Sequence, residues 1–283
     1  MARTIRFTKM HGAGNDYVYV YAPDFPLQNP EELAVLWSDR HKGIGGDGLI
    51  LIGKSDVADF SMRMFNNDGS EGKMCGNGTR CIAKYVYDKG LTQKTVVTLE
   101  TLSGIKVLHL HLGADDKVET VTVDMGEPIL ADTAQCATPD GSLRDGIVEA
   151  AGRQYRGTFV SMGNPHFVIF VPSIASIDLT AEGRALENSP VFPERCNIEF
   201  VEKLPDGALR VRVWERGTGI TQACGTGACA VGTAACLTAH SGRESRIIMD
   251  GGELHIEWRE ADNHIYMTGP AATVFEGEIT IDE

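Results

Sequence analysis

The sequence predicts an α+β protein of two pseudo-symmetric lobes, each a curved, mostly antiparallel sheet wrapped around one central helix. Three features support this: an internal repeat, two glycine-rich cysteine segments that lead into small apolar residues, and many short β-branched runs. We expect an N-terminal lobe over residues 1–122, joined by the last strand at about 272–283, and a C-terminal lobe over residues 123–271. The functional site should lie in the cleft between the lobes.

The repeat becomes visible when the chain is compared with itself at one fixed offset. Cys75 and Cys224, in the segments MCGNGTRC and ACGTGACA, are 149 positions apart (224 − 75). At the same offset, and without a gap, Asn15 and Asn164 each follow a glycine and lead into the strand-like runs YVYVY and HFVIFV. Several such matches in one ungapped register indicate a duplicated architecture.

The same register places the other elements in pairs. Asn29 and Asp178 precede the helix-like runs EELAVLW and LTAEGRAL, so both are candidate N-caps. The strand-like run GLILI matches NIEFV, and MRMFNNDG matches VRVWERGT. The segment after Cys75 has apolar residues at helical spacing, and the segment after Cys224 is rich in alanine, so each predicts a helix that a curved sheet can enclose. Short β-branched runs such as TVVTLET and ELHIEW then predict antiparallel strands.

Composition excludes several classes of function. With 26 Lys+Arg against 39 Asp+Glu, the formal charge of −13 argues against a nucleic-acid groove or a polybasic membrane contact. The sequence shows no secretory signal and no apolar run long enough to span a bilayer. Seven cysteines are too few for a disulfide scaffold in a chain of 283 residues. We therefore expect a cytoplasmic protein with reduced thiols.

The two Cys-Gly-x-Gly segments are the strongest candidates for chemistry. Each stands where an extended run turns into a helix, and a helix N-terminus offers bare N–H groups to an anion. The same position favours a reactive thiolate. Two such thiols on opposite sides of one cleft suit removal of a proton from one face of a carbon next to a carboxylate and delivery to the other face.

Other interpretations of the cysteines and glycines are weaker. A free cysteine is most often a small buried apolar side chain, and we expect this of the other cysteines, namely Cys81, Cys136, Cys196, Cys229 and Cys236. No CxxC pair occurs, so a metal site is not expected. The run from Gly43 to Gly48 fits GxGxxG by letter, but it precedes a strand instead of following one, which argues against dinucleotide binding.

The motifs KMHGAGNDY, GIGGDGL, FNNDGSEGKMCGNGTRC, GNPH and WERGTGITQACGTGACA resemble those of the diaminopimelate epimerases over almost the whole chain. The resemblance implies an isomerase of lysine and peptidoglycan precursor biosynthesis. Such an enzyme converts L,L-diaminopimelate to meso-diaminopimelate without pyridoxal phosphate or any other cofactor. It also implies a homodimer whose ligand is a small amino acid. The negative charge adds the expectation of no nucleic-acid partner and no membrane partner.

Roles follow from the resemblance position by position. Cys75 and Cys224 resemble the paired acid/base thiols, and Cys75 is expected to take the proton from the L,L form. His166 resembles a histidine that supports the thiols. The remaining positions resemble substrate-binding residues: Asn15, Asn66, Gly76, Asn77, Asn164, Asn197, Glu215, Arg216, Gly225 and Thr226.

The residue types support part of this assignment independently. The distal end of diaminopimelate carries both an ammonium and a carboxylate, which Glu215 and Arg216 can bind as an anion and a bidentate cation. A solvated surface pair is the alternative for Glu215 and Arg216, and simple packing is the alternative for His166. Gly48 is a departure, since some family members place glutamine there.

Two other functions remain open from the sequence. A proline-racemase-like enzyme also uses two cysteines on a duplicated fold, but usually has histidine at the position of Asn77. A dithiol redox protein would use Cys75 and Cys224 as well, without needing the asparagines or Glu215 and Arg216.

Overall fold

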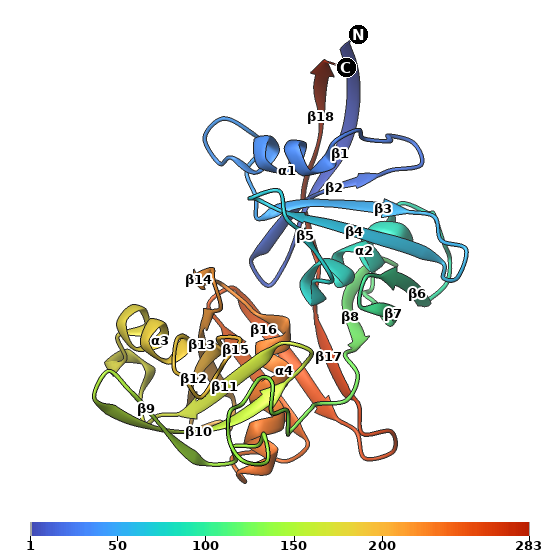
Figure 1. Cartoon of the computed structure of the whole chain (residues 1–283). Coiled ribbons are helices and arrows are strands. Elements are labelled where there is room, and N and C mark those ends of the chain that lie inside the picture. Colours follow the sequence, from blue (N-terminus) through green and yellow to red (C-terminus); the bar gives the residue numbers. More distant parts are fainter. Residues whose placement is uncertain (1, 283) are drawn as a thin grey trace. The chain divides into compact units, whose positions relative to one another are not determined.

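The computed structural model describes residues 2–282, and the chain divides into two compact units. The first unit comprises residues 1–123 and 269–283, and the second comprises residues 124–268. Both termini of the chain therefore belong to the first unit (Figure 1). Within the described part of the chain, none of the helices has the length and apolar character needed to cross a bilayer.

The first unit contains two helices and one mixed sheet (Figure 1). Its helices are α1 (Pro30–Ser38) and α2 (Gly76–Asp88). Its strands are β1 (Ala2–Gly12), β2 (Asn15–Tyr21), β3 (Gly48–Gly53), β4 (Phe60–Asn66), β5 (Glu71–Gly72), β6 (Val96–Thr101), β7 (Gly104–Leu112), β8 (Val118–Asp124) and β18 (Ala272–Asp282). The order across the sheet is β18-β1-β2-β3-β4-β6-β7-β8, with β5 paired to β4. Only the β2–β3 and β4–β6 pairs among these are parallel.

The second unit repeats this arrangement. Its helices are α3 (Leu179–Glu187) and α4 (Gly225–Leu237), with a short 3₁₀ turn η1 (Ile174–Ser176). Its strands are β9 (Gly146–Ala150), β10 (Arg153–Ser161), β11 (Pro165–Phe170), β12 (Asn197–Lys203), β13 (Leu209–Glu215), β14 (Gly219–Ile220), β15 (Glu244–Met249), β16 (Gly252–Trp258) and β17 (Ile265–Pro270). The order is β9-β10-β11-β12-β13-β15-β16-β17, with β14 on β13, and the β11–β12 and β13–β15 pairs are parallel.

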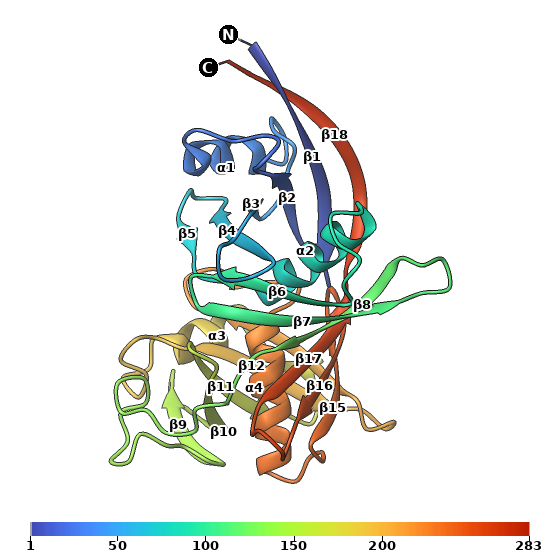
Figure 2. The same ribbon diagram turned by 90° about the vertical axis from the view of Figure 1, so that its right-hand side faces the viewer.

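The predicted α+β fold class and the predicted repeat are therefore confirmed. Helix α1 begins at Pro30 and α3 at Leu179, while α2 begins at Gly76 and α4 at Gly225, so both pairs keep the offset seen in the sequence. In each unit the second helix packs inside the curved sheet. Helix α4 contacts β10, β11, β12, β15 and β16, and it lies alongside β12 and β16 in Figure 2.

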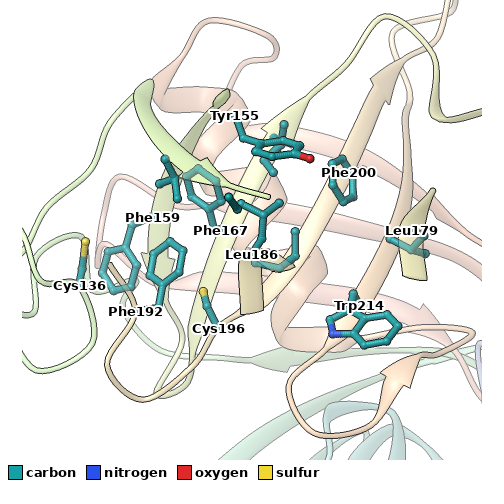
Figure 3. Packing of buried hydrophobic residues seen from close by; sticks show 14 residues of the cluster. Cys136, Tyr155, Phe159, Phe167, Leu179, Leu186, Phe192, Cys196, Phe200 and Trp214 are labelled. Carbon is teal, nitrogen blue, oxygen red and sulfur yellow. The ribbon is translucent and has the colours of Figure 1, made fainter. Parts of the chain in front are cut away.

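Strand alternation explains how each sheet carries two apolar layers. In the second unit, every other residue of β11 and β12 faces α3 and joins an aromatic cluster that includes Phe159, Phe167, Phe192 and Phe200 (Figure 3). The intervening residues of β11 and β12 face the opposite side, where α4 packs. On this side the first residues of both strands are consequently buried, whatever their polarity, among them His166, Asn197 and Glu199.

Both candidate N-caps, Asn29 and Asp178, occupy the N-cap position, but for different reasons. The Asp178 carboxylate accepts a hydrogen bond from the Ala181 N–H, as expected of an N-cap. Asn29 occupies the N-cap position of α1, but its side chain makes no capping hydrogen bond. Its backbone is left-handed, with φ 50°, a conformation that asparagine tolerates better than most residues. Asn29 is therefore the N-cap of α1, as expected, and it suits this position by its backbone conformation.

Candidate active site

The half-site of the first unit is built around Cys75, the N-cap of α2. Its sulfur accepts a hydrogen bond from the Gly78 N–H at 3.3 Å and donates one to Asn15 Oδ1 at 3.2 Å. The Asn77 amide also donates to Asn15 Oδ1, at 3.3 Å. The N–H groups of Gly76 and Asn77 belong to the first turn of α2, where no intrahelical acceptor exists. This half-site thus combines a thiol, two amides and the positive end of a buried helix.

The orientation of the Asn15 amide is set by a carboxylate. Asn15 Nδ2 donates to Asp47 Oδ2 at 2.7 Å, so Oδ1 must face the thiol. Arg40 in turn donates to Asp47 at 3.0 Å and to both oxygens of Asp16. The buried Lys9 completes this group with a 2.7 Å contact to Asp16. Burial alone would raise the pKa of Asp16, but hydrogen bonds from Arg40 and Lys9 outweigh it and hold this pKa below its usual value.

Replacing Asp47 by leucine should therefore lower kcat/KM of the expected isomerase reaction by about tenfold or more. A hydrogen bond to a charged group contributes about 1.5–3 kcal/mol, and its loss leaves the Asn15 amide free to turn its Nδ2 toward the thiol. Asp47→Asn retains an acceptor oxygen and should lose less. Steady-state kinetics of both variants test this, with thermal melting to confirm folding. A leucine variant as active as the unchanged protein would contradict the role given to Asp47.

The half-site of the second unit is built in the same way around Cys224, the N-cap of α4. Its sulfur accepts a hydrogen bond from the Gly227 N–H at 3.4 Å and lies 3.5 Å from Thr226 Oγ1. Asn164 reaches the same turn, since its Nδ2 donates to Thr226 Oγ1 at 3.4 Å. Asn164 and Thr226 thus occupy the places that Asn15 and Asn77 hold in the first unit.

The two thiols differ in their surroundings. Cys75 is half-buried, whereas Cys224 is only 7% exposed. Burial raises the pKa of the Cys224 thiol well above its usual value, and the carboxylates of Glu215 and Glu199 raise it further. Burial also raises the pKa of Glu215, although the Thr221 hydroxyl, which donates to it, acts in the opposite direction.

His166 is fully buried on β11 and pairs with a carboxylate that the sequence analysis did not single out. Its Nδ1 lies 2.7 Å from Glu199 Oε1 on the neighbouring strand β12, and Glu199 is also 0% exposed. His166 Nε2 and Glu199 Oε2 have no hydrogen-bond partner among the described residues. Simple apolar packing, the alternative for His166, does not describe a histidine held by a buried carboxylate.

The remaining polar residues of the second unit are joined through Asn197. Its Nδ2 donates to the Pro165 carbonyl at 2.8 Å, and its Oδ1 accepts from the Arg216 N–H at 2.9 Å. Because Asn197 is buried, these two hydrogen bonds fix the backbone at Pro165 and at Arg216. The Arg216 guanidinium donates to the Glu194 carbonyl at 2.9 Å. Glu215 and Arg216 are both half-buried, which separates them from an ordinary solvated surface pair.

The structure also describes the surroundings of Asn66, a predicted substrate-binding residue, and of Gly48, the departure from the family pattern. The Asn66 amide donates to Ser70 Oγ at 3.0 Å and has no described contact with the thiol. At Gly48, a Cβ atom would lie 2.0 Å from the Phe65 carbonyl oxygen and 2.9 Å from the Tyr17 ring. A glutamine at this position would therefore need a different backbone course, which explains the departure noted in the sequence.

Sequence reasoning missed three further residues near the thiols: Asp47, Glu199 and Arg80. Arg80 is fully buried and donates to Asn77 Oδ1 at 2.8 Å and to the Pro270 carbonyl at 3.2 Å. Asp47 lies inside the motif GIGGDGL, as its one charged residue. Glu199 falls on Ile50 in the repeat register, and this exchange of an apolar residue for an acid was the available signal.

Solved structures show the class of protein to which this fold belongs. A hydroxyproline epimerase from Agrobacterium vitis has a TM-score of 0.70 at 17% identity, covering 99% of this chain and 94% of its own. A PhzF-family phenazine biosynthesis protein from Bacillus anthracis has a TM-score of 0.69 at 18% identity, covering 98% and 99%. The fold is therefore the one that these epimerase and PhzF-family proteins share.

Sequence comparison narrows this class to one family. The diaminopimelate epimerase family profile matches residues 7–131 and 158–274. The diaminopimelate epimerase of Phocaeicola vulgatus is 62% identical over 279 residues, covering 99% of each chain. That of Parabacteroides distasonis is 54% identical over 281 residues, covering 99% of this chain and 100% of its own. The chain belongs to the diaminopimelate epimerase family, and it is an isomerase.

Proposed function

We propose that the protein interconverts L,L-diaminopimelate and meso-diaminopimelate by a two-base mechanism that uses Cys75 and Cys224. The observation that carries this is the matched pair of half-sites. In each unit a cysteine caps a buried helix, and an asparagine from a preceding strand segment contacts the first turn of that helix. Each half supplies one sulfur that can hold a single proton, which is what exchange on the two faces of one carbon requires.

The reaction needs one thiolate and one thiol at the same time. The thiolate removes the α-proton, and the thiol delivers its own proton to the opposite face, so the two sulfurs exchange protonation states in each turnover. The α-carboxylate gains negative charge as the carbanion develops. We assign its stabilisation to the N–H groups of Gly76 and Asn77, and of Gly225 and Thr226, because helix N-termini favour such charge.

The distal end of the substrate is assigned to polar residues of both units. The Arg216 fork suits the distal carboxylate, and the Glu215 carboxylate suits the distal ammonium. Asn15, Asn66 and Asn164 offer amides that can serve either group. Asn197 acts through its hydrogen bond to the Arg216 N–H, which fixes the backbone between Glu215 and the following turn.

Other parts of the proposal concern the protein as a whole. The mechanism uses side chains and backbone only, so it needs neither a metal nor an organic cofactor. A cytoplasmic location is proposed because both sulfurs must stay reduced to work. A homodimer is proposed from the family, and light scattering of the purified protein tests it.

The decisive experiment offers the purified protein L,L-diaminopimelate and separates the stereoisomers of the product by chiral chromatography. Formation of the meso isomer to a constant final ratio from either direction is the expected result. L-proline and trans-4-hydroxy-L-proline serve as competing substrates, because a proline-racemase-like enzyme would turn over one of them. Turnover of a proline, or reduction of a disulfide substrate without any epimerisation, would reject the proposal.

A further inference from the structure

The two half-sites differ in the side chain that lies beneath the first turn of the helix. In the first unit, a Cβ atom on Gly78 would lie 2.8 Å from Ile50 Cδ1. In the second unit, a Cβ atom on Gly227 would lie 2.8 Å from Glu199 Oε1 and 3.3 Å from Cys224 Sγ. Ile50 and Glu199 correspond in the repeat, as do Gly78 and Gly227. An apolar side chain beneath one thiol is thus replaced by a carboxylate beneath the other.

Among the described contacts, the carboxylate of Glu199 pairs only with His166. Both residues are 0% exposed, and the 2.7 Å hydrogen bond joins His166 Nδ1 to Glu199 Oε1. Glu199 Oε2 finds no hydrogen-bond donor among the described residues. No described salt bridge joins Glu199 to a lysine or an arginine, whereas in the first unit Lys9 and Arg40 pair with Asp16.

The other elements that pack around α4 add no positive charge beneath Cys224. The residues of β15 and β16 that face the helix are apolar, among them Met249 and Ile256. Of the charged residues that alternate with them, Glu244, Arg246 and Glu253 are exposed and Glu257 is half-buried. Arg153 and Arg156 of β10 are also exposed. The ionisable groups near Cys224 are therefore Glu199 from β12 and Glu215 from β13, and His166 from β11 lies beside Glu199. Two carboxylates thus lie near the Cys224 thiol, and His166 is the one basic side chain among these groups.

We propose that Glu199 is a positioning residue whose negative charge favours the protonated form of Cys224. Cys75 is then the thiol that ionises first in the substrate-free protein. The proposal rests on the proposed function and deepens it. A thiolate at Cys224 would face a buried carboxylate across the space beneath Gly227, and the repulsion between two anions is strong where water is excluded. A thiolate at Cys75 faces Ile50 instead.

This asymmetry has a consequence for turnover. When Cys75 takes the α-proton and Cys224 gives its own, Cys75 becomes the thiol and Cys224 the thiolate. This is the less stable of the two protonation states. Return to the starting form moves one proton from Cys75 to solvent and one from solvent to Cys224. The number of protons on the two sulfurs is therefore unchanged. The raised pKa of the Cys224 thiol, to which burial contributes first and Glu215 and Glu199 next, supports the same direction.

The test measures iodoacetamide alkylation of each cysteine between pH 6 and pH 10 by peptide mapping, without substrate. In Glu199→Gln the side chain keeps its shape and an acceptor for His166 but loses its charge. The alkylation rate of Cys224 at pH 7.5 should rise about tenfold or more. Its limiting rate at high pH, and the whole Cys75 profile, should stay unchanged. Glu199→Asp, which retains the charge, should return Cys224 toward the rate of the unchanged protein.

A matched control is Glu202→Gln, which removes the same charge from the same strand. Glu202 accepts a hydrogen bond from the Ile174 N–H and should leave the Cys224 profile unaltered. An unchanged Cys224 profile in Glu199→Gln would overturn the proposal. So would an equal rise at every pH, which indicates loosened packing rather than a lost charge. Because alkylation needs no substrate, the outcome is independent of whether the protein acts on diaminopimelate.

Discussion

Replacing either Cys75 or Cys224 by alanine should lower kcat/KM for L,L-diaminopimelate by about 10²- to 10⁴-fold, the range typical for a lost acid/base group. Each thiol serves one face of the α-carbon in the proposed mechanism, so neither can substitute for the other. The effect should be equal for the reverse reaction, because the equilibrium constant fixes the ratio of the two kcat/KM values. Stereoisomer analysis at low conversion measures both directions.

A matched control for Cys224 lies on the same helix. Cys236 is twelve residues further along α4, about 18 Å away at 1.5 Å per residue, and it is only half-buried. Cys236→Ala should keep most of the activity. An alanine variant at Cys75 or Cys224 that retained more than a tenth of the activity would show that its thiol is not the only acid/base on that face.

Turnover of L,L-diaminopimelate in deuterated water should give meso product that carries deuterium at the inverted α-carbon in nearly every molecule. The delivering thiol exchanges its hydrogen with solvent before substrate binds, so its hydrogen is solvent-derived from the first turnover. The removed proton stays on the other sulfur, and collapse back to substrate returns it. Recovered substrate should therefore contain little deuterium at early times.

Mass spectrometry at low conversion decides between two mechanisms. A single base that moved one proton from face to face would give product that retains the original α-hydrogen. Substantial retention in the first few per cent of product would thus contradict the paired-thiol mechanism. The non-enzymatic rate in the same buffer, measured without protein, corrects for background exchange.

Much of the fold could be predicted because the two halves of the sequence constrain each other. A run such as NIEFV is ambiguous alone, but it falls on GLILI in the repeat, and both form strands. The role of Asn29 could not be predicted in this way. Side-chain capping and a left-handed backbone both favour asparagine at the start of a helix, and only the three-dimensional structure shows that the second reason applies.

The site was predictable to a smaller extent. The two cysteines could be predicted from the glycines that follow them, and the structure places both at helix N-termini. Asp47 contacts Asn15, and Glu199 lies beneath the helix turn that follows Cys224. These contacts join residues more than 20 positions apart in sequence. Strand alternation shows that Asn197 and Glu199 share a face, but not that this face lies beneath Cys224. That requires knowing which helix packs on each side of β12.

The pairing of β1 with β18 has a consequence for how the chain matures on the ribosome. Strand β18 pairs with β1 along its whole length, from Ala2 opposite Asp282 to His11 opposite Ala272. The second unit consists of one continuous segment and lies between these two strands in sequence. Translation therefore delivers all of the second unit before the strand that covers the edge of β1. The unit whose synthesis starts first is the last to be completed, and until then the nascent protein exposes an open strand edge that a chaperone can protect.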